Sequence, residues 1–239
     1  MPSRLGAILT LRGDVAADRT NLRRWFVVFL VWMAVAAGLA CWGLAIEQGH
    51  PVAGRLVWLL SIYAFYLSLC NTYCPLPTAW IAMLLPSDFI ARFVGLGDGH
   101  VAERVLATAL VGGVATMMAN LNEYHLTTWL LRLGRIRDLR QRPLYQIAVR
   151  WFDRAAFAAL LVVAFIPLPV DVIRWLAIVR QYPRRRFAAA YLLGRGSRYA
   201  LLAMVSVGLS LKVWHITAIQ AGLVLVAALT LFVRWLRRR

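Results

Sequence analysis

The sequences CPLPTAW (Cys74–Trp80) and IPLPVDV (Ile166–Val172) each place Pro-Leu-Pro inside an apolar stretch, 92 residues apart. Proline breaks a helix interior at a cost of about 3 kcal/mol, because it lacks the backbone N–H and its ring clashes with the preceding turn. The interrupting residues are Pro75, Pro77, Pro167 and Pro169. The two motifs therefore predict a pair of broken or re-entrant helical segments.

The rest of the chain has the composition of a membrane protein. Of its 239 residues 62% are apolar, whereas a soluble domain contains about 45–50%. Apolar runs occupy 25–46, 56–73, 101–134, 151–165, 187–209 and 213–236. We predict an all-α polytopic membrane protein with about five to six transmembrane helices. Residues 1–24 form a basic cytoplasmic N-terminal segment, residues 25–239 form a single transmembrane domain, and 213–236 is the last span.

Positive charge predicts the orientation of the chain. The 27 basic residues outnumber the 10 acidic ones, and they cluster between apolar runs at 19–24, 132–142, 180–186 and 234–239. Loops with many arginines are typical of the cytoplasmic side of a membrane protein, and they attract anionic lipid headgroups. The pattern favours membrane lipids over nucleic acid as partners. It predicts that both termini are cytoplasmic.

The two Pro-Leu-Pro segments can be placed in the membrane in two ways. If every apolar run crosses once, all four basic clusters lie inside, and the two interrupted segments run antiparallel as an inverted repeat. If they are half-membrane hairpins, they enter and leave by the same face, so the predicted side of the membrane changes for the later loops. In either case broken backbone at membrane depth must be buried in protein or line a polar cavity. Paired interrupted segments of this kind often mark a transport site.

Polar side chains within apolar segments are the candidate substrate-binding or lipid-binding residues, because ionisable groups at membrane depth are costly. They are Asp171, Arg174, Arg195, Arg198, Asn120 and Glu123. Asp171 and Arg174 are three residues apart and pair on one helix face, either in a transport site or in a structural salt bridge. The partner expected for Arg195 and Arg198 is Asp171, Glu123 or a lipid phosphate. Asp88 and Arg92, four residues apart, are expected to pair at the membrane interface.

Other classes of function lack their signatures. The sequence contains no metal-binding spacing of histidine or cysteine, no P-loop, no dinucleotide fingerprint and no nucleophile elbow. We therefore predict no enzyme activity, no metal and no cofactor. The number of subunits is left open.

Residues 151–203 resemble the DedA/VTT (SNARE-associated) family of membrane proteins. The similar positions are Phe152 to Phe157, Pro167 to Pro169, Arg186-Phe187 and Gly194 to Arg198, and CPLPTAW fits the first re-entrant segment. The resemblance covers about 55–210. It differs where bacterial members carry an acidic residue in the first re-entrant segment, since Thr78 and Ala79 stand there.

The resemblance implies two re-entrant hairpins in an inverted repeat, a bacterial inner (plasma) membrane location and transbilayer movement of lipids. We therefore expect a lipid transporter or scramblase for an anionic phospholipid or a polyprenyl phosphate. Two alternatives remain open. One is a proton-coupled small-solute transporter, with protons as a second partner, and the other is a membrane assembly or homeostasis factor that transports nothing.

Overall fold

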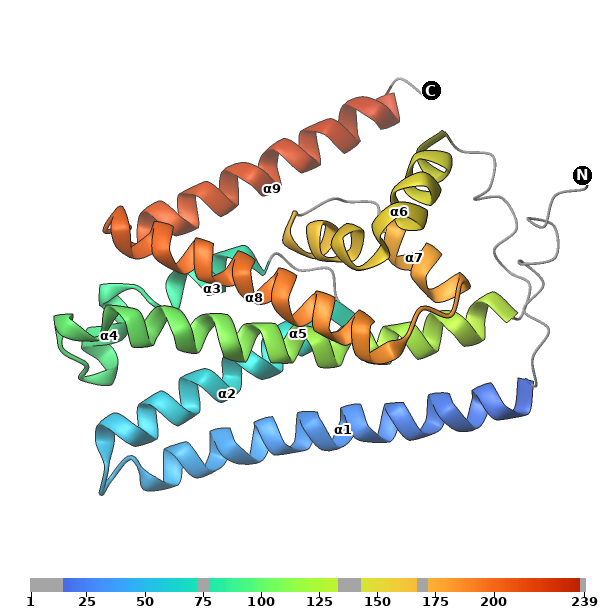
Figure 1. The fold of residues 1–239 in the computed structure, drawn as a ribbon. Helices are drawn as coiled ribbons and strands as arrows, with labels where there is room; N and C mark the ends of the chain where they lie inside the picture. Colours follow the sequence, from blue (N-terminus) through green and yellow to red (C-terminus); the bar gives the residue numbers. More distant parts are fainter. Residues whose placement is uncertain (1–14, 73–77, 133–142, 167–171, 237–239) are drawn as a thin grey trace, which may run out of the picture.

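The computed structural model describes residues 15–72, 78–132, 143–166 and 172–236 (Figure 1). Every element in these ranges is helical, which confirms the predicted all-α class. In chain order the elements are α1 (Val15–Ile46), α2 (Pro51–Thr72), α3 (Ala79–Leu84), α4 (Asp88–Val94), the short 3₁₀ helix η1 (Asp98–His100), α5 (Val101–Arg132), α6 (Pro143–Phe165), α7 (Val172–Val179), α8 (Arg184–Gly208) and α9 (Val213–Leu236).

Three helices of the described residues are long and apolar enough to cross a membrane. They are Thr20–Ile46 within α1, Pro51–Thr72 in α2 and Val101–Trp129 within α5. The shortest of them, with 22 residues, is about 33 Å long at 1.5 Å per residue, and the hydrocarbon core of a bilayer is about 30 Å thick. Large apolar side chains stay exposed along α1: Phe26, Val27, Val28, Leu30, Val31, Val35, Leu39, Trp42 and Leu44. The chain is therefore a membrane-embedded protein.

Two of the predicted basic clusters lie at the same end of the molecule. Figure 1 shows that α1 and α8 begin, and α5 and α9 finish, in the right half of the view. The exposed arginines Arg23 and Arg24 lie near the start of α1, and the exposed Arg184, Arg185 and Arg186 form the start of α8. The arginines at 19–24 and 180–186 thus gather on one side, as the charge pattern predicts.

Helix α5 is the centre of the fold. It packs against α1 and α2 on one side and against α8 on the other (Figure 1). Glycine makes these contacts close: a Cβ on Gly113 of α5 would lie 3.1 Å from Leu192 O and 3.3 Å from Gly196 Cα of α8. A Cβ on Gly194 would lie 2.6 Å from Ala164 Cβ of α6. Small residues let membrane helices approach in this way, so α5, α8 and α6 pack with little space between their backbones.

Two short helices, α3 and α7, follow the Pro-Leu-Pro motifs. The four prolines themselves lie outside the described residues. Helix α3 packs against α8, where Ser206 Oγ donates a 2.6 Å hydrogen bond to Met83 O, and α7 packs against α6 and α5. With 6 and 8 residues they are only about 9 and 12 Å long. Neither helix by itself crosses a hydrocarbon core of about 30 Å.

Helix boundaries differ from the sequence prediction near the first two spans. Helix α1 begins at Val15, ahead of the predicted start of the span at Trp25, because no proline or glycine separates the two positions. Helix α2 begins at Pro51, ahead of the apolar run predicted at 56–73, because proline suits the first turn of a helix. Helix α6 is interrupted at Ala155, whose φ of −155° and ψ of 73° are not helical; this residue lies within the apolar run predicted at 151–165.

The predicted ion pair between Asp88 and Arg92 is not among those formed by the described residues. Asp88 Oδ1 instead accepts a hydrogen bond from Arg104 Nη1 of α5 at 3.3 Å. The same nitrogen donates to Pro86 O at 3.0 Å, and the Arg104 side chain is only 5% exposed. A contact between two helices therefore replaces the local contact that the spacing predicts.

Candidate functional site

A row of polar side chains lies along one face of α5. Thr116, Asn120 and Glu123 are spaced by four and three residues, so they lie one above another on the helix. Thr116 is fully buried and Asn120 is 1% exposed. Asn120 Nδ2 donates a 2.8 Å hydrogen bond to Thr116 O, which satisfies one of its donors within the helix. Thr116 is one residue from the midpoint of the span Val101–Trp129, so the row starts near the middle of the membrane segment.

Helix α7 brings an arginine to this row. Arg174 Nη1 donates a 2.6 Å hydrogen bond to Glu123 Oε2 and a 3.0 Å hydrogen bond to Asn120 Oδ1. The Arg174 and Glu123 side chains are 14% and 20% exposed. A charged pair that has lost most of its water needs such additional hydrogen bonds to be tolerated. The three residues form one ion-paired cluster, although Arg174 lies 51 positions after Glu123 and 54 after Asn120 in the sequence.

Apolar residues surround this cluster. Leu121 and Tyr124 of α5, Leu176 of α7 and Phe187 of α8 belong to one buried core. The Tyr124 hydroxyl donates a 3.1 Å hydrogen bond to Tyr182 O, in the connection between α7 and α8. The surrounding core lowers the local dielectric, which strengthens the attraction between Arg174 and Glu123.

Helix α8 extends the polar contacts toward the middle of the bundle. The Tyr199 hydroxyl shares a 3.1 Å hydrogen bond with Thr116 Oγ1, and the Tyr199 side chain is fully buried. Its ring packs edge-on against Tyr63 of α2, with ring centroids 6.4 Å apart. The Tyr63 hydroxyl in turn donates to Thr108 O at 3.3 Å. Polar groups of α2, α5 and α8 therefore meet inside the bundle.

Arg195 and Arg198 lie at the middle of α8. They are one residue before and two residues after Gly196, the central residue of this 25-residue helix. Both side chains are half-buried, and Arg195 Nε is buried without a hydrogen-bond partner among the described residues. No salt bridge within the described part of the chain involves either arginine. Two cations thus lie at mid-helix without a carboxylate from the described residues.

The structure brings together three of the six predicted site residues, Asn120, Glu123 and Arg174. Arg195 and Arg198 are on a neighbouring helix, and no hydrogen bond within the described residues joins them to the cluster. Asp171, with its predicted pairing to Arg174, lies outside the described residues.

Sequence reasoning missed two members of the buried polar network, Thr116 and Tyr199. A signal for the first was present, because Thr116 precedes Asn120 by four residues and Glu123 by seven on the same helix face. Tyr199 gave no such signal, because a tyrosine next to arginine in a membrane helix is commonly an interface residue.

Taken together, the described helices and the buried polar cluster define an all-helical membrane-embedded protein with ionisable groups inside its bundle. The described residues contain no group of three or more His, Cys, Asp and Glu side chains that could hold a metal ion. No family model matches the chain, and neither a curated protein nor a solved structure matches it.

Proposed function

We propose that the protein is a transbilayer lipid transporter or scramblase, which lets an anionic phospholipid or polyprenyl-phosphate headgroup pass through a polar cavity. The observation that carries the proposal is the position of Arg195 and Arg198, half-buried at the middle of α8 without a carboxylate partner among the described residues. Charged side chains at this depth face water, an opposite charge or a substrate. A phosphate group fits, because the planar guanidinium of arginine matches its oxygens.

The cluster of Glu123, Asn120 and Arg174 supports the same proposal. Arg174 is already paired with Glu123 at 2.6 Å, so its charge is balanced when no substrate is present. Arg195 and Arg198 are then the cations available to a phosphate in passage. In this scheme Arg174 shapes the polar wall and becomes a second contact only when it exchanges Glu123 for the headgroup.

The proposed architecture is an inverted repeat of two re-entrant segments, related to the DedA/VTT family. Support comes from the sequence motifs at the two Pro-Leu-Pro positions and from the short helices α3 and α7 that follow them, with 6 and 8 residues. Support for cytoplasmic termini in a bacterial inner membrane comes from the arginines gathered at one end of the molecule. The proposal involves no covalent chemistry on the lipid.

A reconstitution experiment tests this function. The purified protein is placed in liposomes that contain a fluorescent phospholipid, and accessibility of the label to a membrane-impermeant quencher reports movement between leaflets. Arg195→Ala and Arg198→Ala should each slow this movement about tenfold or more, the factor expected for one lost charge-assisted contact. Arg186→Ala is the matched control, because Arg186 is an exposed arginine of the same helix. Absence of lipid movement at every protein density would refute the proposal.

A proton-coupled small-solute transporter is the second candidate. The specific observation in its favour is the Glu123 carboxylate, which faces Arg174 inside the bundle and can change its charge only by taking up a proton. Solute uptake that follows a pH gradient and is lost in Glu123→Gln and Asp171→Asn would support it. If the liposomes show neither lipid movement nor solute uptake, and the arginine variants only lower stability, the remaining function is an assembly or homeostasis factor.

A further inference from the structure

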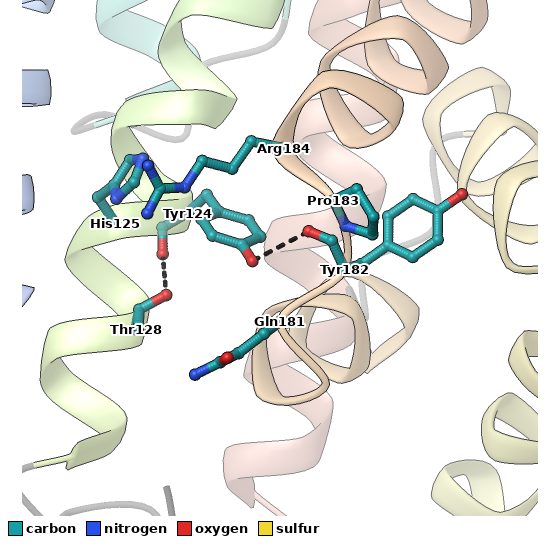
Figure 2. A pocket seen from close by; sticks show the side chains of 7 residues that line it. All are labelled: Tyr124, His125, Thr128, Gln181, Tyr182, Pro183 and Arg184. Carbon is teal, nitrogen blue, oxygen red and sulfur yellow. Dashed lines mark hydrogen bonds between the residues drawn. The ribbon is translucent and has the colours of Figure 1, made fainter. Parts of the chain in front are cut away.

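A second polar site lies at the end of the molecule where the arginines gather. It is a pocket of about 380 Å³ between α5 and the connection from α7 to α8. Figure 2 shows His125 and Thr128 on the α5 side, with Gln181 and Arg184 approaching from the other side. Thr128 Oγ1 donates to Tyr124 O at 2.7 Å, so this hydroxyl is already used within α5. The pocket is separate from the cluster of Asn120, Glu123 and Arg174.

The electrostatics of this pocket favour an anion. It is lined by Arg184, the first residue of α8, and none of the described residues that line it is acidic. The amide N–H groups at a helix start point outward and carry a partial positive charge. Pro183, at the N-cap position, supplies no side-chain cap. Three consecutive arginines, Arg184 to Arg186, add positive charge where the helix dipole disfavours cations. An anion at this position would relieve that repulsion.

His125 provides an independent indication of a ligand. The residue is 5% exposed, it lines the pocket, and its Nε2 atom has no hydrogen-bond partner among the described residues. Trp25 of α1 stacks on the imidazole, with ring centroids 5.2 Å apart and an interplanar angle of 10°. Tyr124 packs edge-on against the same ring at 5.5 Å. These two contacts fix the plane of the imidazole, so an N–H at Nε2 has a defined direction for donation.

The connection from α7 to α8 holds the opposite wall in place. Gln181 adopts a left-handed backbone conformation with φ of 51°. Its N–H donates to Ile178 O at 3.0 Å, and the N–H of Tyr182 donates to Ala177 O at 2.9 Å. This pair of hydrogen bonds is the Schellman motif that ends many helices, usually with glycine at the left-handed position. A glutamine there adds an amide side chain to the pocket wall.

We infer that this pocket binds a phosphate group through Arg184, His125 and the N-terminal amides of α8, and that the phosphate belongs to a lipid headgroup or to free phosphate. The two sources share the chemistry of a tetrahedral oxyanion. The aromatic residues Trp25 and Tyr182 beside the pocket are of the kind enriched at membrane interfaces. The inference deepens the proposed function, since it names a headgroup site at the end of the molecule, and its test measures binding rather than transport.

The experiment uses the full-length protein in detergent and native mass spectrometry with dioleoyl phosphatidic acid. Dioleoylglycerol, which lacks the phosphate, is the matched lipid. Arg184→Gln should weaken binding of phosphatidic acid about tenfold or more, and His125→Phe, which keeps an aromatic ring against Trp25, should also weaken it. Arg185→Gln removes the same charge from the next residue, which does not line the pocket, and should change binding much less.

Each outcome has a defined meaning. Equal weakening by Arg184→Gln and Arg185→Gln, or equal binding of the two lipids, would overturn the inference, because attraction would then be unspecific. If millimolar inorganic phosphate displaces phosphatidic acid from the wild type but not from Arg184→Gln, the site binds phosphate from solution as well as on a lipid. If His125→Phe does not fold, the two arginine variants still decide the question. Lipid movement that fails while phosphatidic acid still binds would refute the proposed function alone.

Discussion

The ion pair between Arg174 and Glu123 allows a quantitative prediction of stability. Glu123→Leu removes the carboxylate that Arg174 contacts at 2.6 Å, with the two side chains only 14% and 20% exposed. Removing one partner of a buried pair costs about 3–5 kcal/mol, because the other charge is left uncompensated. Arg174 keeps its 3.0 Å hydrogen bond to Asn120 Oδ1, so we expect the lower end, about 3 kcal/mol. For a chain of this size this corresponds to a fall in Tm of about 6–12 °C.

The reverse variant and the double variant complete a thermodynamic cycle. Arg174→Met alone removes the cation that contacts Glu123 Oε2, and it should lower Tm by a similar amount. The combination of Glu123→Leu with Arg174→Met removes both charges and leaves apolar side chains in an apolar core, so it should lose much less than the sum of the single variants. The measurement is thermal unfolding of the detergent-solubilised protein, followed by tryptophan fluorescence.

A matched control and a refuting result follow from the same geometry. Arg186→Met removes a charge from an exposed arginine and should shift Tm by no more than about 2 °C, since exposed charges contribute little to stability. Single variants at Glu123 and Arg174 that resemble this control would show that the pair is solvated and does not hold α7 against α5. Strict additivity in the double variant would lead to the same conclusion.

Three further predictions concern packing and backbone. Gly194→Val should destabilise the protein by about 1–3 kcal/mol, because its Cβ would lie 2.6 Å from Ala164 Cβ; Gly38→Ala, with nothing within 4 Å of the added atom, should raise Tm slightly. Ser210→Gly should stabilise by up to about 1 kcal/mol, since Ser210 has φ of 48°, and Ser210→Val should destabilise; denaturant unfolding distinguishes the two. Tyr199→Phe should lower the free energy of unfolding by about 1 kcal/mol, because the hydrogen bond to Thr116 is lost. An unchanged Tm in the same thermal assay would show that this hydrogen bond contributes nothing to stability.

The existence and type of the long helices could be predicted because their physical causes are local. Twenty or more apolar residues bounded by arginine, glycine or proline specify a membrane helix with little help from tertiary contacts. Helix α5 illustrates this, since the prediction from Val101 to about Gly134 ends two residues from the observed Arg132. The starts of α1 and α2 were less predictable, because the polar residues next to an apolar run can be helical or form a loop with little difference in free energy.

The members of the polar cluster could be selected from the sequence, but their partners could not. Polarity within an apolar run identified Asn120, Glu123 and Arg174, because such residues are costly wherever they are placed. Sequence spacing offers only neighbours within a helix, so it paired Asp88 with Arg92. The actual partner, Arg104, belongs to α5, 16 positions away in the sequence. Likewise the contact of Arg174 with Glu123 arises from the docking of α7 on α5, across 51 positions.

The glycine contact between α5 and α8 has a mechanical consequence. A Cβ at Gly113 would lie only 3.1 Å from Leu192 O and 3.3 Å from Gly196 Cα, so even an alanine there would push the neighbouring atoms of α8 away. The spacing between α5 and α8 therefore depends on the absence of a side chain at Gly113. Helix α7 is held to the bundle by buried side chains such as Leu176 and by the hydrogen bonds of Arg174 to α5.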